Sequence, residues 1–296
     1  MLKRTLYISN PYHLSIKNKQ LVVSEKNGMP LKTAPVEDLG FIVLDHPQIS
    51  FTMKLVEELN EVNVATVFCD SKHLPSSMLL PLDANHIQNE IFRAQISATE
   101  PLKKNLWKQT IEAKIKNQAR LLSKLGKNSI PLKAVGRTVK SGDSDNREGF
   151  AARLYWMELL GRNFIRDRYG DPPNPFLNYG YILLRSAVAR ALAGSGLLAT
   201  LGIHHRNRYN AFCLADDVME PYRPYVDEIV FEMKKSWPDV FMLGKEHKAE
   251  LLQLMTADVK IGETKRPLMI ALSQTTASLA KCFNGEQRKI VYPEFD

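Results

Sequence analysis

Hydrophobic residues in the first seventy positions fall into short runs separated by Gly, Pro and Asn. The runs are rich in Val, Ile, Phe and Thr, and they read TLYISN, HLSIKNKQLVVSE, GFIVLD and ATVFCD. Short runs of this composition are typical of β-strands and hairpins. The pair Asn27-Gly28 adds a strong signal for a hairpin turn. The pattern therefore predicts a small β-rich domain over residues 1–72.

One stretch inside this region follows a helical period instead. In FTMKLVEELNEVN, the residues Phe51, Leu55 and Leu59 recur every four positions, which predicts a helix between two strands. The stretch SKHLPSSMLLPLDAN that follows the last strand contains Pro and Ser, so residues 73–88 are the predicted linker.

From residue 89 onward the apolar spacing is three to four, which predicts helices through residues 89–296. In the segment that begins at Pro101, the apolar stripe consists of Leu106, Ile111, Ile115, Ala119 and Leu122. Later helices are predicted near residues 147–170, 175–202, 216–237, 245–256 and 266–285. The expected fold class is α+β, with a small N-terminal β-rich domain followed by a larger all-α C-terminal domain.

Charge narrows the classes of partner. The 296 residues carry a formal net charge of +8, with a pI of about 9.2, which favours acidic partners and nucleic acid first among them. Between residues 103 and 140 there are eleven Lys or Arg residues and one acid, Glu112. A solvated helix face normally mixes both signs, so this imbalance favours a surface that faces phosphates.

Several other classes are disfavoured. Three widely spaced cysteines without a CxxC pair argue against a disulfide framework and a zinc finger. No stretch has the apolar length of a transmembrane helix, and the N-terminus lacks the apolar region of a secretory signal. We therefore expect a cytoplasmic protein with no membrane partner. No phosphate-binding GxxxxGK[ST] loop and no GxSxG nucleophile motif occurs.

Candidate metal ligands lie in two stretches. In LGIHHRNRYNAFCLADDVMEPYRP, Asp217 and Glu220 are three residues apart and would share one face of a helix, and His205 lies fifteen residues before Glu220. In SDNREGFAARLYW, Glu148 follows the capping candidates Ser144, Asp145 and Asn146. Acids at such positions are also common as solvated surface pairs and as helix caps. Spacing alone leaves both interpretations open.

Three blocks in this order resemble a known family. EGFAARLYW, NPFLNYGYILLRSAVARALAGSGLLATLGIHH and LADDVMEPYRPYVD look like the CRISPR-associated spacer-acquisition integrases, most closely the branch found in type II systems. The resemblance covers most of the chain, including the change from β to helical pattern. It implies an endonuclease or integrase that joins the 3′-hydroxyl of a short DNA fragment to a CRISPR repeat by transesterification.

The resemblance also implies a ligand set for Mg²⁺ or Mn²⁺. Glu148 matches the first ligand of the family, His205 the second and Glu220 the third, and these three would be the catalytic residues. His204 is the less favoured neighbour of His205, and Asp217 is close enough in sequence to assist Glu220.

Expected partners follow from the family and from the charge. They are double-stranded DNA, a second copy of the chain, and the small "Cas-two" protein in a heterohexamer, with the type II effector machinery as a further candidate. The residues proposed to contact DNA are Lys103, Lys104, Lys108, Lys114, Arg162, Arg166, Arg206 and Arg208. Two alternatives remain: a non-catalytic DNA-binding scaffold protein, and a metal-dependent nuclease that only hydrolyses.

Overall fold

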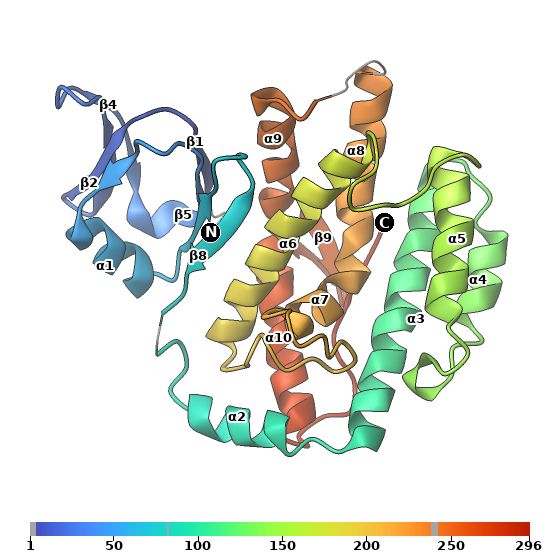
Figure 1. Ribbon diagram of the computed structural model, residues 1–296. Coiled ribbons are helices and arrows are strands. Elements are labelled where there is room, and N and C mark those ends of the chain that lie inside the picture. Colours follow the sequence, from blue (N-terminus) through green and yellow to red (C-terminus); the bar gives the residue numbers. More distant parts are fainter. Residues whose placement is uncertain (1–3, 82, 238–241) are drawn as a thin grey trace. The chain divides into compact units, whose positions relative to one another are not determined.

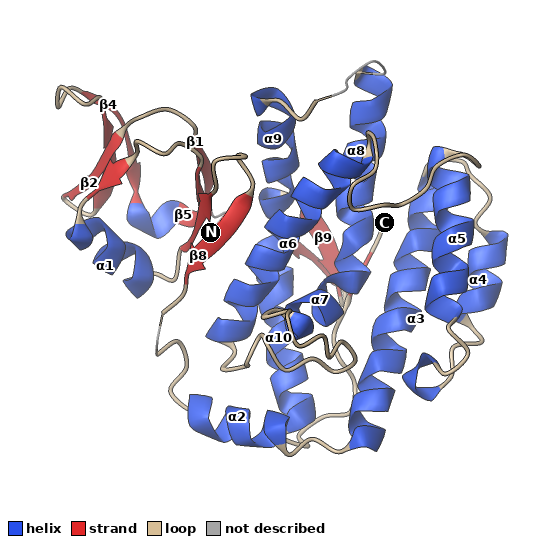
Figure 2. Ribbon diagram, viewed as in Figure 1, coloured by secondary structure: helices blue, strands red, loops and turns tan. Residues whose placement is uncertain are grey.

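The computed structural model describes residues 4–81, 83–237 and 242–296 (Figure 1). Residue 82 of the predicted linker and residues 1–3 of the predicted β-rich domain lie outside the described residues. The chain divides into two compact units, Met1–Asp83 and Ala84–Asp296. The first unit is built mainly from strands and the second mainly from helices (Figure 2), so the α+β class is confirmed.

The first unit contains two four-stranded sheets. One has the strand order β1-β5-β7-β8, in which β8 alone is antiparallel to its neighbour, and the other has the order β4-β3-β2-β6. Its elements are β1 (Arg4–Ile8), β2 (His13–Lys17), β3 (Gln20–Ser24), β4 (Pro30–Pro35), β5 (Leu39–Leu44), β6 (Ser50–Phe51), α1 (Met53–Glu61), β7 (Ala65–Cys69) and β8 (Pro75–Leu79).

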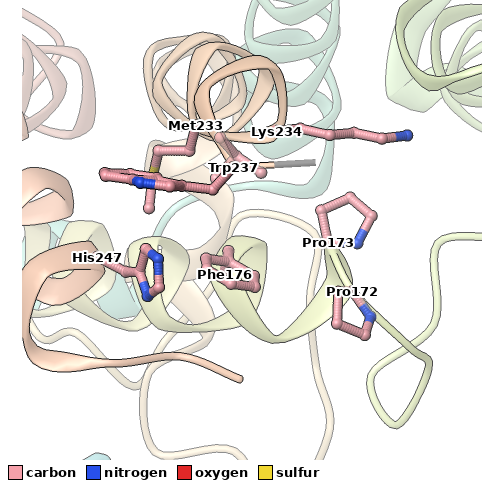
Figure 3. Close-up of a pocket in the computed structure, with 8 residues that line it drawn as sticks. Pro172, Pro173, Phe176, Met233, Lys234, Trp237 and His247 are labelled. Atoms are coloured by element: carbon pink, nitrogen blue, oxygen red, sulfur yellow. The ribbon is translucent and has the colours of Figure 1, made fainter. Parts of the chain in front are cut away.

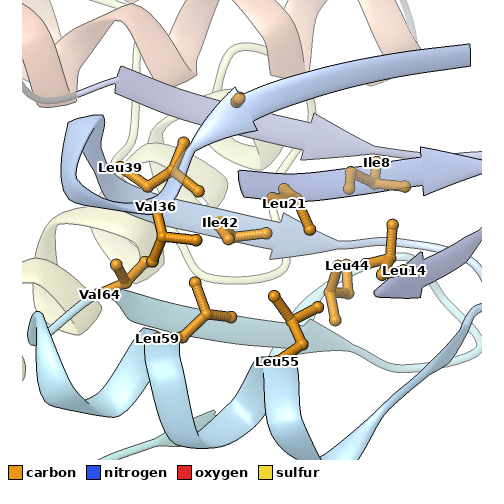
Figure 4. Packing of buried hydrophobic residues seen from close by; sticks show 11 residues of the cluster. Ile8, Leu14, Leu21, Val36, Leu39, Ile42, Leu44, Leu55, Leu59 and Val64 are labelled. Atoms are coloured by element: carbon orange, nitrogen blue, oxygen red, sulfur yellow. The ribbon is translucent and has the colours of Figure 1, made fainter. Parts of the chain in front are cut away.

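Buried apolar side chains form the core of this unit. Side chains from both sheets and from α1 meet in one cluster, which Figure 4 shows with Leu55 and Leu59 of α1 facing Ile42 and Leu44 of β5. Burial of each such side chain contributes on the order of 1.5–3 kcal/mol. The period-four spacing of Leu55 and Leu59 thus predicted a helix correctly, whereas Phe51, the first residue of the predicted stripe, is exposed and lies in strand β6.

One detail of the first unit refines the sequence prediction and another corrects it. The run HLSIKNKQLVVSE forms two antiparallel strands, because Asn18 and Lys19 both have positive φ angles, as a two-residue hairpin turn requires. In addition, β8 lies inside the predicted linker and pairs with β7. The predicted start of the linker at residue 73 was therefore wrong: the prolines of this stretch do not prevent a strand at the edge of a sheet.

The second unit contains α2 to α10. The helices are α2 (Gln88–Ile96), α3 (Glu100–Lys124), α4 (Ile130–Gly136), α5 (Arg147–Leu160), α6 (Asn174–Gly194), α7 (Cys213–Met219), α8 (Arg223–Ser236), α9 (Lys245–Leu252) and α10 (Leu268–Phe283). A 3-10 turn, η3 (Glu220–Tyr222), connects α7 to α8, and another, η2 (Ser141–Asp143), precedes α5.

The second unit is not entirely helical. Strands β9 (Asp258–Ile261), β10 (Thr264–Pro267) and β11 (Pro293–Glu294) form a small antiparallel sheet that the helical periodicity did not indicate. Within the described part of the chain, no helix is long and apolar enough to cross a membrane.

Helix α3 is the element that the site depends on. Thr99 caps its first turn, Pro101 lies in that turn, and the predicted apolar stripe from Leu106 to Leu122 is buried. The helix packs against α4 and α5, which lie beside it in Figure 1, and also against α8 and η3. Because it has neighbours on more than one side, several of its polar residues are buried as well.

Candidate metal centre

Glu148 stands in the first turn of α5, where a dense set of caps holds it. Asn146 has a left-handed backbone conformation, and its side-chain oxygen accepts the Gly149 N–H at 3.0 Å. The carboxylate of Asp143 accepts the N–H groups of Arg147 at 2.8 Å and of Glu148 at 3.0 Å. The sequence indicated Asn146 among its capping candidates and missed Asp143, which lies in the preceding 3-10 turn. These hydrogen bonds fix the backbone of the first turn and therefore the direction in which the Glu148 side chain projects from it.

The structure also explains why residue 149 is a glycine. A Cβ atom at this position would lie 2.7 Å from the Asn146 side-chain oxygen, closer than real contacts allow. The absence of a side chain at Gly149 therefore permits the cap that positions its neighbour Glu148.

Lys114 of α3 brings Glu148 and Glu220 together. Its Nζ lies 2.6 Å from Oε1 of Glu148 and 2.6 Å from Oε2 of Glu220, although the two glutamates are 72 residues apart. The side chains of Lys114 and Glu220 are 9% and 3% exposed, whereas that of Glu148 is 26% exposed. Two carboxylates and one ammonium thus form a cluster that is largely shielded from solvent.

Each charged group of this cluster stabilises the charged form of its neighbours. Burial alone would raise the pKa of Glu220, but Arg223, with NH2 2.8 Å from Glu220 Oε1, and Lys114 outweigh burial and lower it. Burial alone would lower the pKa of Lys114, and the carboxylates of Glu220 and Glu148 outweigh it and raise it. Glu220 and Lys114 are therefore both charged at neutral pH.

His205 is held by Asp217. The ring Nδ1 of His205 lies 2.5 Å from Asp217 Oδ1, and the hydrogen bond to Asp217 raises the pKa of the imidazole in spite of its partial burial. The two oxygens of Asp217 also accept the N–H groups of Ile203, His204 and His205. With Nδ1 used in this way, Nε2 is the ring nitrogen left to bind a metal.

The hydrogen-bond partners of Asp217 show whether Asp217 or Glu220 is the better candidate for a metal ligand. Asp217 is fully buried, and both of its oxygens hold the 203–205 loop, so it supports His205 from behind. Glu220 faces the lysine that also contacts Glu148. The geometry therefore favours Glu220 as the ligand and assigns Asp217 to positioning.

The loop itself needs Gly202. A Cβ atom at that position would lie 2.4 Å from the His205 carbonyl oxygen and 2.8 Å from Asp217 Oδ2. The loop can fold over Asp217 only because residue 202 has no side chain.

Trp107 of α3 distinguishes the two histidines. Its indole stacks flat on His204, with ring centroids 4.3 Å apart, and meets His205 edge-on at 5.7 Å. His204 is thereby used as a stacking partner, and His205 is near enough to Glu220 for each charge to influence the pKa of the other. The arrangement favours His205 over His204 as the ligand.

The donor set suits a hard divalent cation. Two carboxylates are typical Mg²⁺ ligands, and an imidazole with its second nitrogen held by a carboxylate shifts the preference towards Mn²⁺. Among residues 4–81, 83–237 and 242–296, no three His, Cys, Asp or Glu side chains stand as a preformed metal cluster. Lys114 occupies the position between Glu148 and Glu220. The residues therefore fit the metal in the type of donor atoms that they supply.

The predicted DNA contacts separate into three groups. Lys104, Arg162 and Arg208 are exposed, and no ion pair links them to another described residue. Some are paired at the surface: Lys103 and Arg206 with Glu100, and Lys108 with Glu112. The third group comprises Lys114, which is buried, and Arg166, which is partly buried and bonded to neighbouring side chains.

Two of these predictions therefore need correction. The prediction for Lys114 was wrong, because the residue is buried between glutamates and cannot reach DNA from the helix surface. Arg166 donates to the side chains of Asn174 and Asn178 and lies over the Tyr181 ring, so its guanidinium is also used internally. A lysine-rich sequence did not reveal which lysine faced the interior.

A separate pocket lies between α6, α8 and α9. Figure 3 shows Phe176, Trp237 and His247 on its wall, together with Pro172 and Pro173. The rings of Trp237 and His247 meet edge-on with centroids 4.8 Å apart. None of the predicted site residues lines this pocket, so it is not part of the candidate metal centre.

Fold and site together define a class of protein. It is a two-domain α+β protein whose helical domain brings Glu148 and Glu220 to one buried lysine, Lys114, and holds His205 against Asp217. Comparison then identifies the family: the family model for CRISPR associated protein Cas1 matches residues 6–237, and the chain belongs to that family.

Curated relatives agree with this assignment. The CRISPR-associated endonuclease Cas1 of Neisseria meningitidis serogroup C (strain 8013) is 38% identical over 235 residues, which are 79% of this chain and 76% of the relative. The CRISPR-associated endonuclease Cas1 1 of Francisella tularensis subsp. novicida (strain U112) is 27% identical over 272 residues, covering 83% and 84% of the two chains.

Solved structures share the fold at lower identity. A casposase bound to integration product superposes with a TM-score of 0.81 at 19% identity, covering 100% of this chain and 95% of that one. A Cas1 protein from Thermotoga maritima gives 0.75 at 18% identity, covering 96% and 98%. A Cas6-RT-Cas1–Cas2 complex gives 0.72 at 18% identity, covering 100% of this chain and 36% of that one.

Proposed function

We propose that this protein is a divalent-metal-dependent DNA endonuclease and integrase that inserts short DNA fragments into a CRISPR array. The single observation that carries the proposal is the meeting of Glu148 and Glu220 at one buried cation, with His205 held beside them by Asp217. The relatives named as endonucleases and the casposase bound to integration product support the same reaction class.

Glu148, His205 and Glu220 would hold Mg²⁺ or Mn²⁺. When bound, such an ion activates a hydroxyl and neutralises charge that develops on a phosphate. The attacking 3′-hydroxyl of the fragment forms a new P–O bond, the bond to the target strand's 3′-oxygen breaks, and that oxygen leaves with a proton. One phosphodiester replaces another, so the joining step requires no external source of energy.

The remaining residues of the site position these ligands. Asp217 holds Nδ1 of His205, so that Nε2 is the ring nitrogen left for a metal, and the caps of α5 fix Glu148. Arg208 and Lys104 are exposed and available for phosphate oxygens. A second copy of the chain and the small Cas2 protein are the proposed partners, as the Cas1–Cas2 complexes with this fold suggest.

An integration assay tests the proposal. The substrates are a 5′-labelled double-stranded fragment and a supercoiled plasmid that carries a CRISPR repeat, incubated with Mn²⁺ and with or without the Cas2 partner. We expect label to enter the plasmid with the natural protein, and Glu148→Ala to reduce joining by at least about a hundredfold, because one of three ligands is lost. Glu158→Ala changes an acid on the same helix away from the site and serves as the matched control.

The same assay separates the alternatives. Nicked plasmid without incorporated label would indicate a nuclease that only hydrolyses. DNA binding without either product, in the presence of every partner, would indicate a scaffold protein. Normal joining by Glu148→Ala would overturn the assignment of the metal centre.

A further inference from the structure

Lys114 belongs to a polar face of α3 that contacts each part of the site. Trp107 touches both histidines, and Lys114, two helical turns further on, touches both glutamates. Asn117, one turn beyond Lys114, donates to the carbonyl of Pro221, the residue that follows Glu220. One helix face therefore connects the three blocks of sequence that supply the ligands.

The ammonium of Lys114 occupies the position that a shared cation would need. Glu148 Oε1 and Glu220 Oε2 are each 2.6 Å from the same nitrogen, so they lie no more than 5.2 Å apart. A divalent cation bound to one oxygen of each carboxylate spans a similar gap, since metal–oxygen distances are about 2.0–2.6 Å. The lysine therefore holds the carboxylates near the spacing that a metal requires.

The lysine and a metal ion cannot both keep these contacts. Arg223 already contacts the other oxygen of Glu220 at 2.8 Å, so the two carboxylates face two protein cations before any metal arrives. A third cation at the same oxygens would meet a buried like charge at short range, which is strongly unfavourable. Binding of a metal by both glutamates thus requires the ammonium to move away.

We propose that Lys114 is a positioning residue that acts as an internal counter-ion: it spaces Glu148 and Glu220 for a divalent cation and competes with that cation for them. This inference rests on the proposed function, because it concerns the same metal centre. Its consequence is a threshold: the protein stays folded and charge-balanced at low metal concentration and takes up metal only when the ion outcompetes the lysine.

Removal of the lysine should weaken the stability of the metal-free protein and strengthen its binding of Mn²⁺. Lys114→Met leaves two neighbouring carboxylates without their shared cation, so the melting temperature without metal falls. The same carboxylates then attract Mn²⁺ without competition, so the dissociation constant for Mn²⁺ falls by about tenfold or more. A lysine that merely supported the fold would weaken both stability and metal binding.

The experiment measures Mn²⁺ binding directly. Free Mn²⁺ is followed by its electron paramagnetic resonance signal during titration of the full chain, and the melting temperature is recorded with and without Mn²⁺. The variants are Lys114→Met, Lys114→Gln as a polar neutral substitution, and Lys114→Arg, which keeps the charge. Lys124→Met removes an exposed lysine of the same helix that pairs with Glu228, and it is the matched control.

The outcomes decide both proposals separately. Tighter Mn²⁺ binding by Lys114→Met or Lys114→Gln, with near-natural binding by Lys114→Arg and Lys124→Met, supports the inference. Equal or weaker binding by both neutral variants, while the natural protein binds Mn²⁺ and Glu148→Ala does not, overturns the role of Lys114 and leaves the proposed function intact. Absence of Glu148-dependent binding in every variant overturns both.

Discussion

At the scale of single residues, the number of donors that a carboxylate satisfies decides its role. Asp217 accepts three backbone N–H groups and one imidazole nitrogen, and it is fully buried. Glu220 is paired with two cationic side chains, Lys114 and Arg223. Asp217 is therefore occupied mainly by the backbone and supports the 203–205 loop, whereas Glu220 is paired with side-chain cations, for which a metal ion could compete under the proposed function.

The first prediction concerns Asp217→Asn. The substitution replaces an acceptor oxygen with an amide N–H and removes the charge that orients His205, so Mn²⁺ affinity falls by about 10–100-fold, the usual cost of losing an outer-shell partner. The measurement is Mn²⁺ titration by paramagnetic resonance. Asp216→Asn, whose natural carboxylate pairs with Arg185, is the neighbouring control and keeps its affinity. Unchanged affinity in Asp217→Asn would contradict the positioning role.

Asp227 provides a residue-scale prediction about pH. It is buried, it accepts hydrogen bonds from Tyr155 and Tyr181, and Arg166 and Arg223 face it. Burial raises its pKa from 3.8 to about 6 in spite of these partners. The folded protein therefore keeps a proton that the unfolded chain loses, so this contribution to stability is complete below pH 3.8 and is lost as the pH rises to about 6.

The corresponding measurement compares the natural protein with Asp227→Asn. A difference of this size in pKa corresponds to roughly 3 kcal/mol. In urea unfolding, the stability of Asp227→Asn relative to the natural protein should rise between pH 4 and pH 6.5 by an amount of that order. A constant difference across this range would show that Asp227 titrates normally.

At the scale of elements, α3 contributes more than its apolar stripe. Asn117 donates to the carbonyls of Pro221 and Pro293 and accepts the N–H of Phe295, so it ties α3 to η3 and to the C-terminal segment that contains β11. Asn117→Ala removes three buried hydrogen bonds and leaves their partners unsatisfied. We expect a loss of about 3 kcal/mol in unfolding free energy by urea denaturation. Asn105→Ala, at an exposed site of the same helix, is the control, and an equally small effect for both would contradict this role.

The elements also show how far sequence alone could reach. The spacing of apolar residues correctly predicted α1 and the apolar stripe of α3. A helix that buries one face carries apolar residues every three to four positions, and this pattern is visible in the sequence. It could not show that Trp107, Lys114 and Asn117 are buried too, because a second packed face appears only when distant elements are in place. The only signal of this second buried face in the sequence was the seven-residue spacing of Trp107 and Lys114. The other lysines of the same segment made Lys114 look like one more surface residue.

The candidate metal ligands were predicted by a different route from the helices. Glu148, His205 and Glu220 were indicated by a resemblance over three motif blocks, since spacing alone favoured helix caps and solvated surface pairs over a metal site. The structure gives the blocks a shared geometry through Lys114 and Asp217.

At the scale of the whole molecule, net charge overstates the surface available to DNA. Of the eight predicted contacts, Lys114 is buried and the partly buried Arg166 is bonded to two asparagines, while Lys103, Lys108 and Arg206 pair with acids. Three exposed residues remain without an ion pair to the described part of the chain: Lys104, Arg162 and Arg208. These three should account for more of the phosphate binding than the paired residues, which must first give up an acid.

The final prediction tests this division through salt dependence. Each phosphate contact contributes about 0.9 to the slope of log affinity against log salt concentration on duplex DNA. Individual substitutions of Lys104, Arg162 and Arg208 by Gln should each lower that slope by nearly one, measured by fluorescence anisotropy with one labelled duplex over a range of KCl concentrations. Lys108→Gln should lower it less, because in the natural protein Lys108 lies 3.6 Å from Glu112 and exchanges one partner for another. Equal slopes for all four variants would show that the ion pairs do not limit which basic residues bind the DNA backbone.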